Sequence, residues 1–337
     1  MEFEVNKLLS PYIYNDILGL SKRIDFKPFT KKTVIITGAA RPMGIYLSTA
    51  FLINNDLNNA ETKIIAVDTD DKIFERYGKL TYRGDIDFVV SRDYSYFGGE
   101  TADFIIHTQS FDELEKFDAA VNLMNFIKNS QATAVIAFGS GIYGEVFNGK
   151  AQISEADAFG YINFSKANSF EIQNSRMVQA LAVKLARDCN ADVKLAVLPE
   201  IYGAGMARWH ELLTNVSGKR NVLVDQSEMP QSVIYLADAA AALVTILLKG
   251  TKGEAYNIAS DYALNSAILA EKCSEYIYGG ELKIIFTGKQ ASLSPLAPTL
   301  RILDNTKLKS LGFTPEFDLK SGITRTLNIM SEKGGEA

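Results

Sequence analysis

The chain has 337 residues, of which 47% are hydrophobic, so it can bury a continuous core as one large α/β domain or two modest ones. Its formal net charge is −5 and it has no dense Lys/Arg block, which argues against a nucleic-acid surface as its main role. Two widely spaced cysteines and two histidines argue against a disulfide framework, a structural zinc or a histidine-rich metal site.

The N-terminal segment, residues 1–30, precedes the first apolar run. It predicts a helical extension that acts as a cap or a dimer contact, or one without a role of its own. Its first residues, MEFEVNKLL, are acidic where a secretory signal is basic and then apolar, and no uncharged apolar run is long enough to cross a bilayer. We expect a cytoplasmic protein that does not bind membranes.

Short runs rich in Val and Ile alternate with longer helical patterns in the next part of the chain. The runs are TVIIT from 33, KIIAVD from 63, DFIIH from 103, TAVIAF from 133 and VKLAVL from 193. Between them, segments such as IYLSTAFLINN, FDAAVNLMNFIKN and SRMVQALAVKLARDC repeat apolar residues at helical spacing. This alternation is typical of a parallel sheet with crossover helices. We predict a Rossmann-type, doubly wound α/β domain over residues 31–200, plus about 233–260.

The alternation of strand and helix patterns becomes less regular after IYGAG at 201. The segment SVIYLADAAAALVTILLKG predicts one long helix, GEAYNIAS predicts another strand, and the tail predicts short helices around a Gly/Pro turn. Residues 201–232 and 261–337 are therefore expected to form a smaller, substrate-binding lobe.

A loop that contains glycine, TGAARPMG at 37–44, joins the first strand to the first helix. Glycines in such a loop permit a tight turn, close approach of a pyrophosphate and close packing of helix on strand, while the helix N-terminus offers free N–H groups. Gly38 and Gly44 keep the first and last of these roles. The middle glycine is replaced by Arg41 in one register and by Pro42 in another.

This loop resembles the cofactor loop of the short-chain dehydrogenase/reductase superfamily, whose extended branch carries TGxxGxxG. From about residue 30 to 330 the chain resembles the NAD-dependent epimerase/dehydratase family of that branch, which modifies nucleotide sugars. The most telling segment, SVIYLADAAAALVTILLKGTKGEAYNIAS, is similar to the family's YVxD…GxxYNI. The resemblance implies NAD as cofactor and a nucleotide-diphosphate sugar as substrate.

The resemblance also implies a set of cofactor contacts. IIAVDTD would offer Asp68 or Asp70 to the adenosine ribose and favour NAD over NADP, although a solvated acidic turn is an equal alternative. YRGDID resembles the family's Gly-Asp-hydrophobic step beside the adenine. DFIIHTQS resembles IIHxAS, so that His107 passes the cofactor or is simply a satisfied histidine at a strand end. The implied set is Gly38, Arg41, Met43, Gly44, Asp68, Asp85, Ile86, His107 and Asn122, the last from AVNLMNFIK.

In this family a Ser or Thr and a Tyr hold the sugar oxygen, and a Lys in a YxxxK pair lowers the pKa of the tyrosine. Counting back from IYG places the family's serine at Gly139, with Ser140 one position later. Tyr161 and Lys166 lie five apart in YINFSK, which misses the one-turn spacing on a helix.

A second register, over IQNSRMVQALAVKLAR, places Ile172 at the tyrosine and Arg176 at the lysine. Isoleucine exchanges no proton, and arginine keeps its charge without relaying one. Val197 and Gln231 replace two arginines of the family pattern. These substitutions fall together in the expected pocket.

Two residues are implied as substrate ligands. EIYGAGM resembles vYGPGm and supplies Tyr202, while LRILDNTKLKSLGFTPEFDLKSGI resembles the family's ending and supplies Arg301. The forked guanidinium of Arg301 suits a diphosphate.

Two functions follow. The first is a nucleotide-sugar epimerase/dehydratase-like oxidoreductase that uses NAD, in surface polysaccharide or sugar-nucleotide metabolism, with Ser140, Tyr161 and Lys166 as its acid/base set. The alternative is a catalytically inactive homologue that serves as a nucleotide-binding or scaffolding subunit of an active paralogue. In a third, weaker interpretation Arg41 binds a different anion. A homodimer through FDAAVNLMNFIK and RMVQALAVKLAR is expected.

Overall fold

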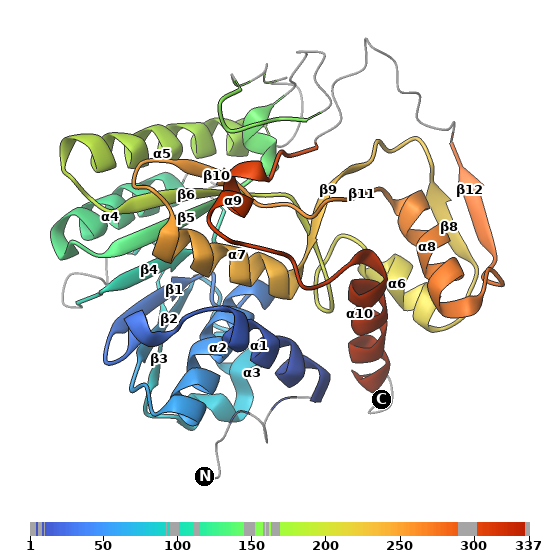
Figure 1. Cartoon of the computed structure of the whole chain (residues 1–337), viewed down its shortest axis with the longest axis horizontal. Coiled ribbons are helices and arrows are strands. Elements are labelled where there is room, and N and C mark those ends of the chain that lie inside the picture. The colour runs from blue at the N-terminus through green and yellow to red at the C-terminus, as the bar shows by residue number, and fades with distance from the viewer. Residues whose placement is uncertain are drawn as a thin grey trace.

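The computed structural model describes residues 5, 9, 11–91, 93–94, 101–110, 115–144, 152–157, 159, 162, 169–288 and 302–333. Figure 1 shows an α/β domain on the left and a smaller lobe on the right, with both N- and C-terminal segments on the lower side. Within the described part of the chain, every helix is too short or too polar to span a bilayer.

Seven parallel strands form the main sheet in the order β10-β6-β5-β4-β1-β2-β3. Because β1 pairs with β2 on one side and with β4 on the other, the winding reverses at β1, and open α/β sheets bind ligands at such a point, at the carboxyl ends of the strands. The predicted Rossmann-type fold is confirmed. The strands are β1 (Thr33–Thr37), β2 (Lys63–Asp68), β3 (Ile86–Val90), β4 (Phe104–His107), β5 (Thr133–Gly139), β6 (Val193–Leu198) and β10 (Ala255–Asn257).

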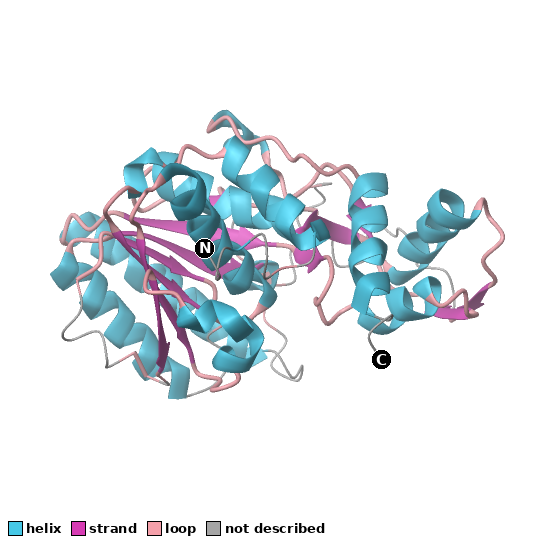
Figure 2. Cartoon of the chain, turned by 90° about the horizontal axis from the view of Figure 1, so that it is seen from below, coloured by secondary structure: helices cyan, strands magenta, loops and turns pink. Residues whose placement is uncertain are grey.

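Helices cover both faces of this sheet, as Figure 2 shows. Alternate residues of β1 serve the two layers: Val34 and Ile36 join the core under α2 and α7, whereas Ile35 joins the core under α4 and α5. The first layer contains α2 (Pro42–Asn58), α3 (Ile73–Tyr77), the 3-10 turn η3 (Gly78–Tyr82) and α7 (Leu236–Lys249); the second contains α4 (Glu115–Ser130), the 3-10 turn η5 (Ser140–Tyr143) and α5 (Ser169–Asp188).

The N-terminal segment forms α1 (Pro11–Arg23), followed by the 3-10 turn η2 (Lys27–Phe29). Ile17 and Leu20, three residues apart on one helix face, are fully buried in the core that also contains α2 and α7. This burial makes α1 a part of the packed domain, so the expectation of an extension without a role does not fit the structure.

The lobe contains α6 (His210–Ser217), α8 (Ser266–Tyr278) and α10 (Leu319–Lys333), with a parallel pair of strands, β8 (Val222–Asp225) and β12 (Ile284–Thr287). The short helix α9 (Thr306–Ser310) lies beside β10 of the main sheet (Figure 1). A second sheet, ordered β11-β9-β7, joins β7 (Glu200–Tyr202), β9 (Gln231–Tyr235) and β11 (Ala263–Leu264). The prediction of one long helix over SVIYLADAAAALVTILLKG was therefore wrong at its start, because the β-branched Val233 and Ile234 extend β9 before α7 begins at Leu236.

Candidate active site at the carboxyl ends of the strands

The loop 37–44 leaves the carboxyl end of β1 in a tight turn that requires glycine at two positions. Gly38 has a φ of +74°, and a Cβ there would lie 2.6 Å from the Thr108 Oγ1. A Cβ on Gly44 would lie 2.4 Å from both the Gly38 carbonyl oxygen and the Ala39 Cα. The first and last glycines therefore set the shape of the turn and the close packing of α2 on it.

Asp68, at the end of β2, holds the loop from its own buried position. One carboxylate oxygen accepts a hydrogen bond from the Ala40 N–H at 2.8 Å, and the other accepts one from the Asp70 N–H at 3.1 Å. Asp68 is fully buried, and its carboxylate orients the loop through these two hydrogen bonds. A ribose would have to share the oxygens that these two amides already use.

Two side chains of α3 hold the carbonyl groups of the same loop. Tyr77 donates its hydroxyl proton to the Ala39 carbonyl at 3.1 Å, and the Arg76 guanidinium donates to the Ala40 carbonyl at 2.5 Å. Arg76 also pairs with Asp70 at 3.2 Å. The loop is thus fixed on the side that faces α3, and no sequence motif predicted this support.

Few N–H groups of the loop remain for a ligand. The Ala40 N–H binds Asp68, the Arg41 N–H donates to the Gly38 carbonyl at 3.1 Å, and Pro42 has none. The N–H groups of Met43 and Gly44 make no hydrogen bond with the described residues, and both belong to the first turn of α2. The Arg41 side chain is exposed at the N-cap of α2 and forms no hydrogen bond or ion pair within the described part of the chain.

His107 ends β4 in a fully buried position. Its Nδ1 lies 2.6 Å from the Thr37 hydroxyl, and its ring meets the Tyr94 ring edge-on at 5.8 Å between centroids. Burial lowers the pKa of His107 to about 3. The imidazole is therefore neutral near pH 7.

Gln109 stands where the IIHxAS pattern has alanine, and its side chain is buried. Its amide nitrogen donates to the Thr69 hydroxyl at 2.9 Å, and its amide oxygen accepts from the Tyr94 hydroxyl. These bonds connect the residues that follow β4, β2 and β3 across the end of β1. Gln109 and Tyr94 were missed at the sequence level; the only signal was the departure from alanine.

The structure corrects the positions expected for Asp85 and Ile86. Ile86 pairs with Ile64 near the start of β2, so both residues lie at the amino end of β3, opposite the loop. Asp85 binds Arg83 at 2.7 Å and accepts from the Asn55 amide at 2.9 Å. Burial alone would raise the pKa of Asp85, but the hydrogen bonds from Arg83 and Asn55 and the charge of Arg83 together outweigh it and lower the pKa. The Gly-Asp step here begins a strand, whereas an adenine contact requires it after one.

Asn122 of α4 donates to the Asp93 carbonyl at 2.8 Å and so fastens the segment that follows the carboxyl end of β3. Asn122 therefore supports that segment.

A polar pocket of about 230 Å³ lies where β5, β6 and α5 meet. Ser140, partly buried, lines it from the first position of η5. Ile172 lines it from α5 and packs on Gly141, whose added Cβ would lie 3.6 Å from the Ile172 Cγ1. Glu171, Ser175 and Glu200 complete its polar lining, and sequence reasoning had singled out none of these three. Tyr161, Lys166 and Arg301 lie outside the described residues.

Arg176, the candidate for the family's lysine in the second register, is committed to protein groups. Its Nε donates to the Ile142 carbonyl at 2.7 Å, and its guanidinium lies 4.6 Å from the centre of the Phe159 ring. On the other side of the pocket, Glu200 pairs with Arg208 at 3.1 Å.

Tyr202 is placed away from this pocket. Its side chain is only 2% exposed, and its hydroxyl lies 2.7 Å from the Tyr262 hydroxyl. A Cβ on Gly322 of α10 would lie 2.1 Å from the Tyr202 hydroxyl oxygen, so the tyrosine packs directly beneath that helix. The predicted substrate contact is corrected: Tyr202 joins β7 to the lobe.

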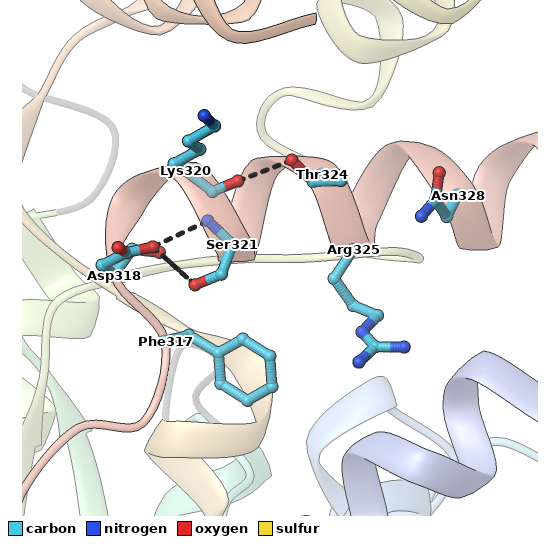
Figure 3. Close-up of a pocket in the computed structure, with 7 residues that line it drawn as sticks. All are labelled: Phe317, Asp318, Lys320, Ser321, Thr324, Arg325 and Asn328. Atoms are coloured by element: carbon cyan, nitrogen blue, oxygen red, sulfur yellow. Dashed lines mark hydrogen bonds between the residues drawn. The ribbon is translucent and has the colours of Figure 1, made fainter.

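A further cavity of about 460 Å³ runs along α10 and is drawn in Figure 3. It is lined by Phe317, Asp318, Lys320, Ser321, Thr324, Arg325 and Asn328. The Asp318 carboxylate, just before α10, accepts a hydrogen bond from the Ser321 N–H at 2.8 Å. Arg325 points away from α10 toward α1. This open groove is formed by one helix and the residue pair before it.

Known proteins resemble this chain mainly in fold. No protein-family model matches the chain. Low-salt glycan biosynthesis protein Agl12 of Haloferax volcanii is 36% identical over 90 residues, which span 27% of this chain and only 28% of that protein.

Solved structures match nearly the whole chain. DesIV, a dTDP-glucose 4,6-dehydratase from Streptomyces venezuelae crystallised with NAD, has a TM-score of 0.72 at 15% identity, over 90% of this chain and 98% of that one. Epimerase Mth375 from Methanothermobacter thermautotrophicus has 0.73 at 14%, over 97% and 98%. UDP-glucuronic acid 4-epimerase from Bacillus cereus, in complex with NAD, has 0.71 at 16%, over 89% and 99%. The chain therefore has the Rossmann-type fold of these nucleotide-sugar dehydratases and epimerases.

Proposed function

We propose that the chain binds NAD at the loop 37–44 and acts on a nucleotide-diphosphate sugar as an oxidoreductase of the epimerase/dehydratase type. The observation that carries this proposal is the tight loop itself. Gly38 and Gly44 leave no room for a Cβ, the loop lies where the winding of the sheet reverses, and two N–H groups at the start of α2 are free. These features suit the pyrophosphate of a dinucleotide.

NAD, when bound, supplies a nicotinamide that can accept a hydride from a sugar carbon. The pocket beside β5 offers this chain's own groups for the sugar. Ser140 presents a hydroxyl that can donate to a sugar oxygen, and Glu171 and Glu200 present carboxylates that can accept from sugar hydroxyls. Tyr161 and Lys166 remain the proposed acid/base pair.

An assay with NAD and a panel of uridine, thymidine and guanosine diphosphate sugars tests this function, with products identified by NMR spectroscopy. We expect one sugar nucleotide to be converted. Ser140→Ala should lower turnover about 10- to 100-fold, because it removes a hydrogen bond to the reacting oxygen, and should leave the NAD affinity unchanged. If both ligands bind and no sugar in the panel is converted, the enzymatic function is contradicted.

The second candidate is a non-catalytic, nucleotide-binding subunit that pairs with an active paralogue. The structure offers a specific observation in its favour: Ile172 fills the position of the second-register tyrosine in the pocket, and Arg176 binds the Ile142 carbonyl. Ligand binding without turnover, together with higher turnover of an active partner on addition of this chain, would support this function.

A further inference from the structure

The loop 37–44 has a shortage of backbone donors. A helix start of this kind normally presents several free N–H groups to an anion. In this chain the Ala40 and Arg41 N–H groups are used within the protein, and Pro42 has no N–H. Among the described residues, the Gly38, Met43 and Gly44 N–H groups of the loop remain without a hydrogen-bond partner. A dinucleotide carries a negative charge on each of its two phosphates, so this backbone set leaves that charge incompletely matched.

A side chain at position 41 also changes the shape of the loop. Glycine at the middle position allows the backbone to approach the pyrophosphate closely. The Cβ of Arg41 would prevent that approach and would keep the phosphates farther from the backbone. A long cationic side chain can bridge this added distance, whereas the backbone N–H groups cannot.

Arg41 is the loop's own cation, and it is uncommitted. Its side chain is exposed and forms no hydrogen bond or ion pair with the residues that the structure describes. Nearby, Arg76 is already held by the Ala40 carbonyl at 2.5 Å and by Asp70 at 3.2 Å. Arg41 is the N-cap residue of α2 and so lies at the positive end of the helix dipole, where an anion is favoured.

We propose that Arg41 is a ligand of the cofactor pyrophosphate, and that its forked guanidinium replaces the backbone contacts that the missing glycine and Pro42 would have supplied. This inference rests on the proposed function, because it assigns a residue to the same NAD site. It makes a prediction opposite to that of the family pattern: restoring glycine at position 41 weakens binding.

Titration calorimetry with NAD, ADP and adenosine tests this proposal on wild type, Arg41→Ala, Arg41→Gly and Arg41→Lys. Loss of one charge-assisted contact should weaken NAD and ADP binding about 10- to 100-fold in the alanine and glycine variants. Arg41→Lys should recover part of the affinity, since it keeps the charge without the fork. Adenosine binding should change less than about twofold, because it lacks the phosphates.

Arg220→Ala is the matched control, since Arg220 is an exposed arginine in the lobe and its removal changes the net charge equally. Thermal melting of each variant verifies folding. If wild type binds NAD and Arg41→Gly binds it equally well or more tightly, the role of Arg41 is overturned and the proposed function stands. If wild type binds no NAD, both are overturned. If adenosine binding falls as much as NAD binding, the effect is a distortion of the loop and the inference fails.

Discussion

In and around the loop 37–44, some residue roles could be predicted from sequence motifs and others could not. Gly38 and Gly44 were identified from their spacing, and both are required by contacts shorter than any Cβ could make. Asp85 was misplaced, because the letters Gly-Asp do not reveal whether they begin or end a strand. The hydrogen bond between Gln109 and Tyr94 joins residues 15 positions apart in sequence on two different loops, so no local pattern could predict it.

Gly44→Ala tests the packing of the loop at the level of one residue. Its Cβ would lie 2.4 Å from backbone atoms of Gly38 and Ala39, so the turn or α2 must shift. We expect the free energy of unfolding to fall by about 1–3 kcal/mol, and NAD affinity to fall at least about 10-fold. Chemical denaturation and NAD titration measure the two effects. Gly84→Ala is the control, since nothing lies within 4 Å of its Cβ; equal behaviour of the two variants would contradict the account of the loop.

At the level of elements, the strands with long Val/Ile runs and the helices between them could be predicted, since burial on both faces of a parallel sheet leaves a continuous apolar signal. The strand β3, IDFVV, was missed because its exposed edge position mixes Asp87 into a short run. The division of SVIYLADAAAALVTILLKG into β9 and α7 depends on pairing with β7 and β11, which are distant in sequence.

The helix α1 is the element whose role was least visible in the sequence. Its Asp16 is 1% exposed and lies among groups of three other elements: Tyr46 of α2 at 3.5 Å, Tyr235 of β9, and Arg325 of α10 at 2.9 Å. Its Arg23 pairs with Asp238 of α7 at 2.7 Å and with Glu316, just before α10, at 2.9 Å. Through these contacts α1 connects the Rossmann domain to the lobe.

This burial predicts a pH dependence of stability. Desolvation raises the pKa of Asp16 from 3.8 to about 6, against the opposing hydrogen bond from Tyr235 and charge of Arg325; the nearby Glu316 adds to the rise. The folded state therefore binds the proton more tightly than the unfolded state does. The contribution of Asp16 to stability is fully present below pH 3.8 and is lost as the pH rises through about 6.

Asp16→Asn should remove this dependence. At about 1.4 kcal/mol per pKa unit, the free energy of unfolding of wild type relative to the variant should fall by roughly 2.4 kcal/mol between pH 4 and pH 7. Urea denaturation of both proteins across this range measures the difference, which cancels the titration of the other carboxylates. Asp71→Asn, at an exposed position, is the control and should show no such slope. A constant difference between wild type and Asp16→Asn would contradict the assignment.

At the level of the whole molecule, the face of α5 that points to solvent carries a row of apolar side chains. Phe170, Met177 and Leu181 are 44%, 43% and 37% exposed, and they recur at helical spacing beside α4. Such a row fits the proposed homodimer through α4 and α5, because a second copy would bury it.

A double substitution tests this interface. Met177→Glu with Leu181→Glu should convert the dimer to a monomer, since it would place four carboxylates in an apolar contact between two chains. Sedimentation equilibrium measures the mass of each protein. Leu223→Glu, at a residue 67% exposed on β8 of the lobe, is the matched control and should leave the dimer intact. A wild-type chain that sediments as a monomer at all concentrations would rule the interface out.

We propose that the loop at the carboxyl end of β1 still binds a dinucleotide, although its middle glycine has been replaced. Calorimetric titration of the purified wild-type chain with NAD tests it most directly. We expect saturable binding at one site per chain that Gly44→Ala weakens at least about 10-fold and Gly84→Ala leaves unchanged. Absence of binding up to millimolar NAD, or binding that Gly44→Ala leaves unchanged, would contradict it.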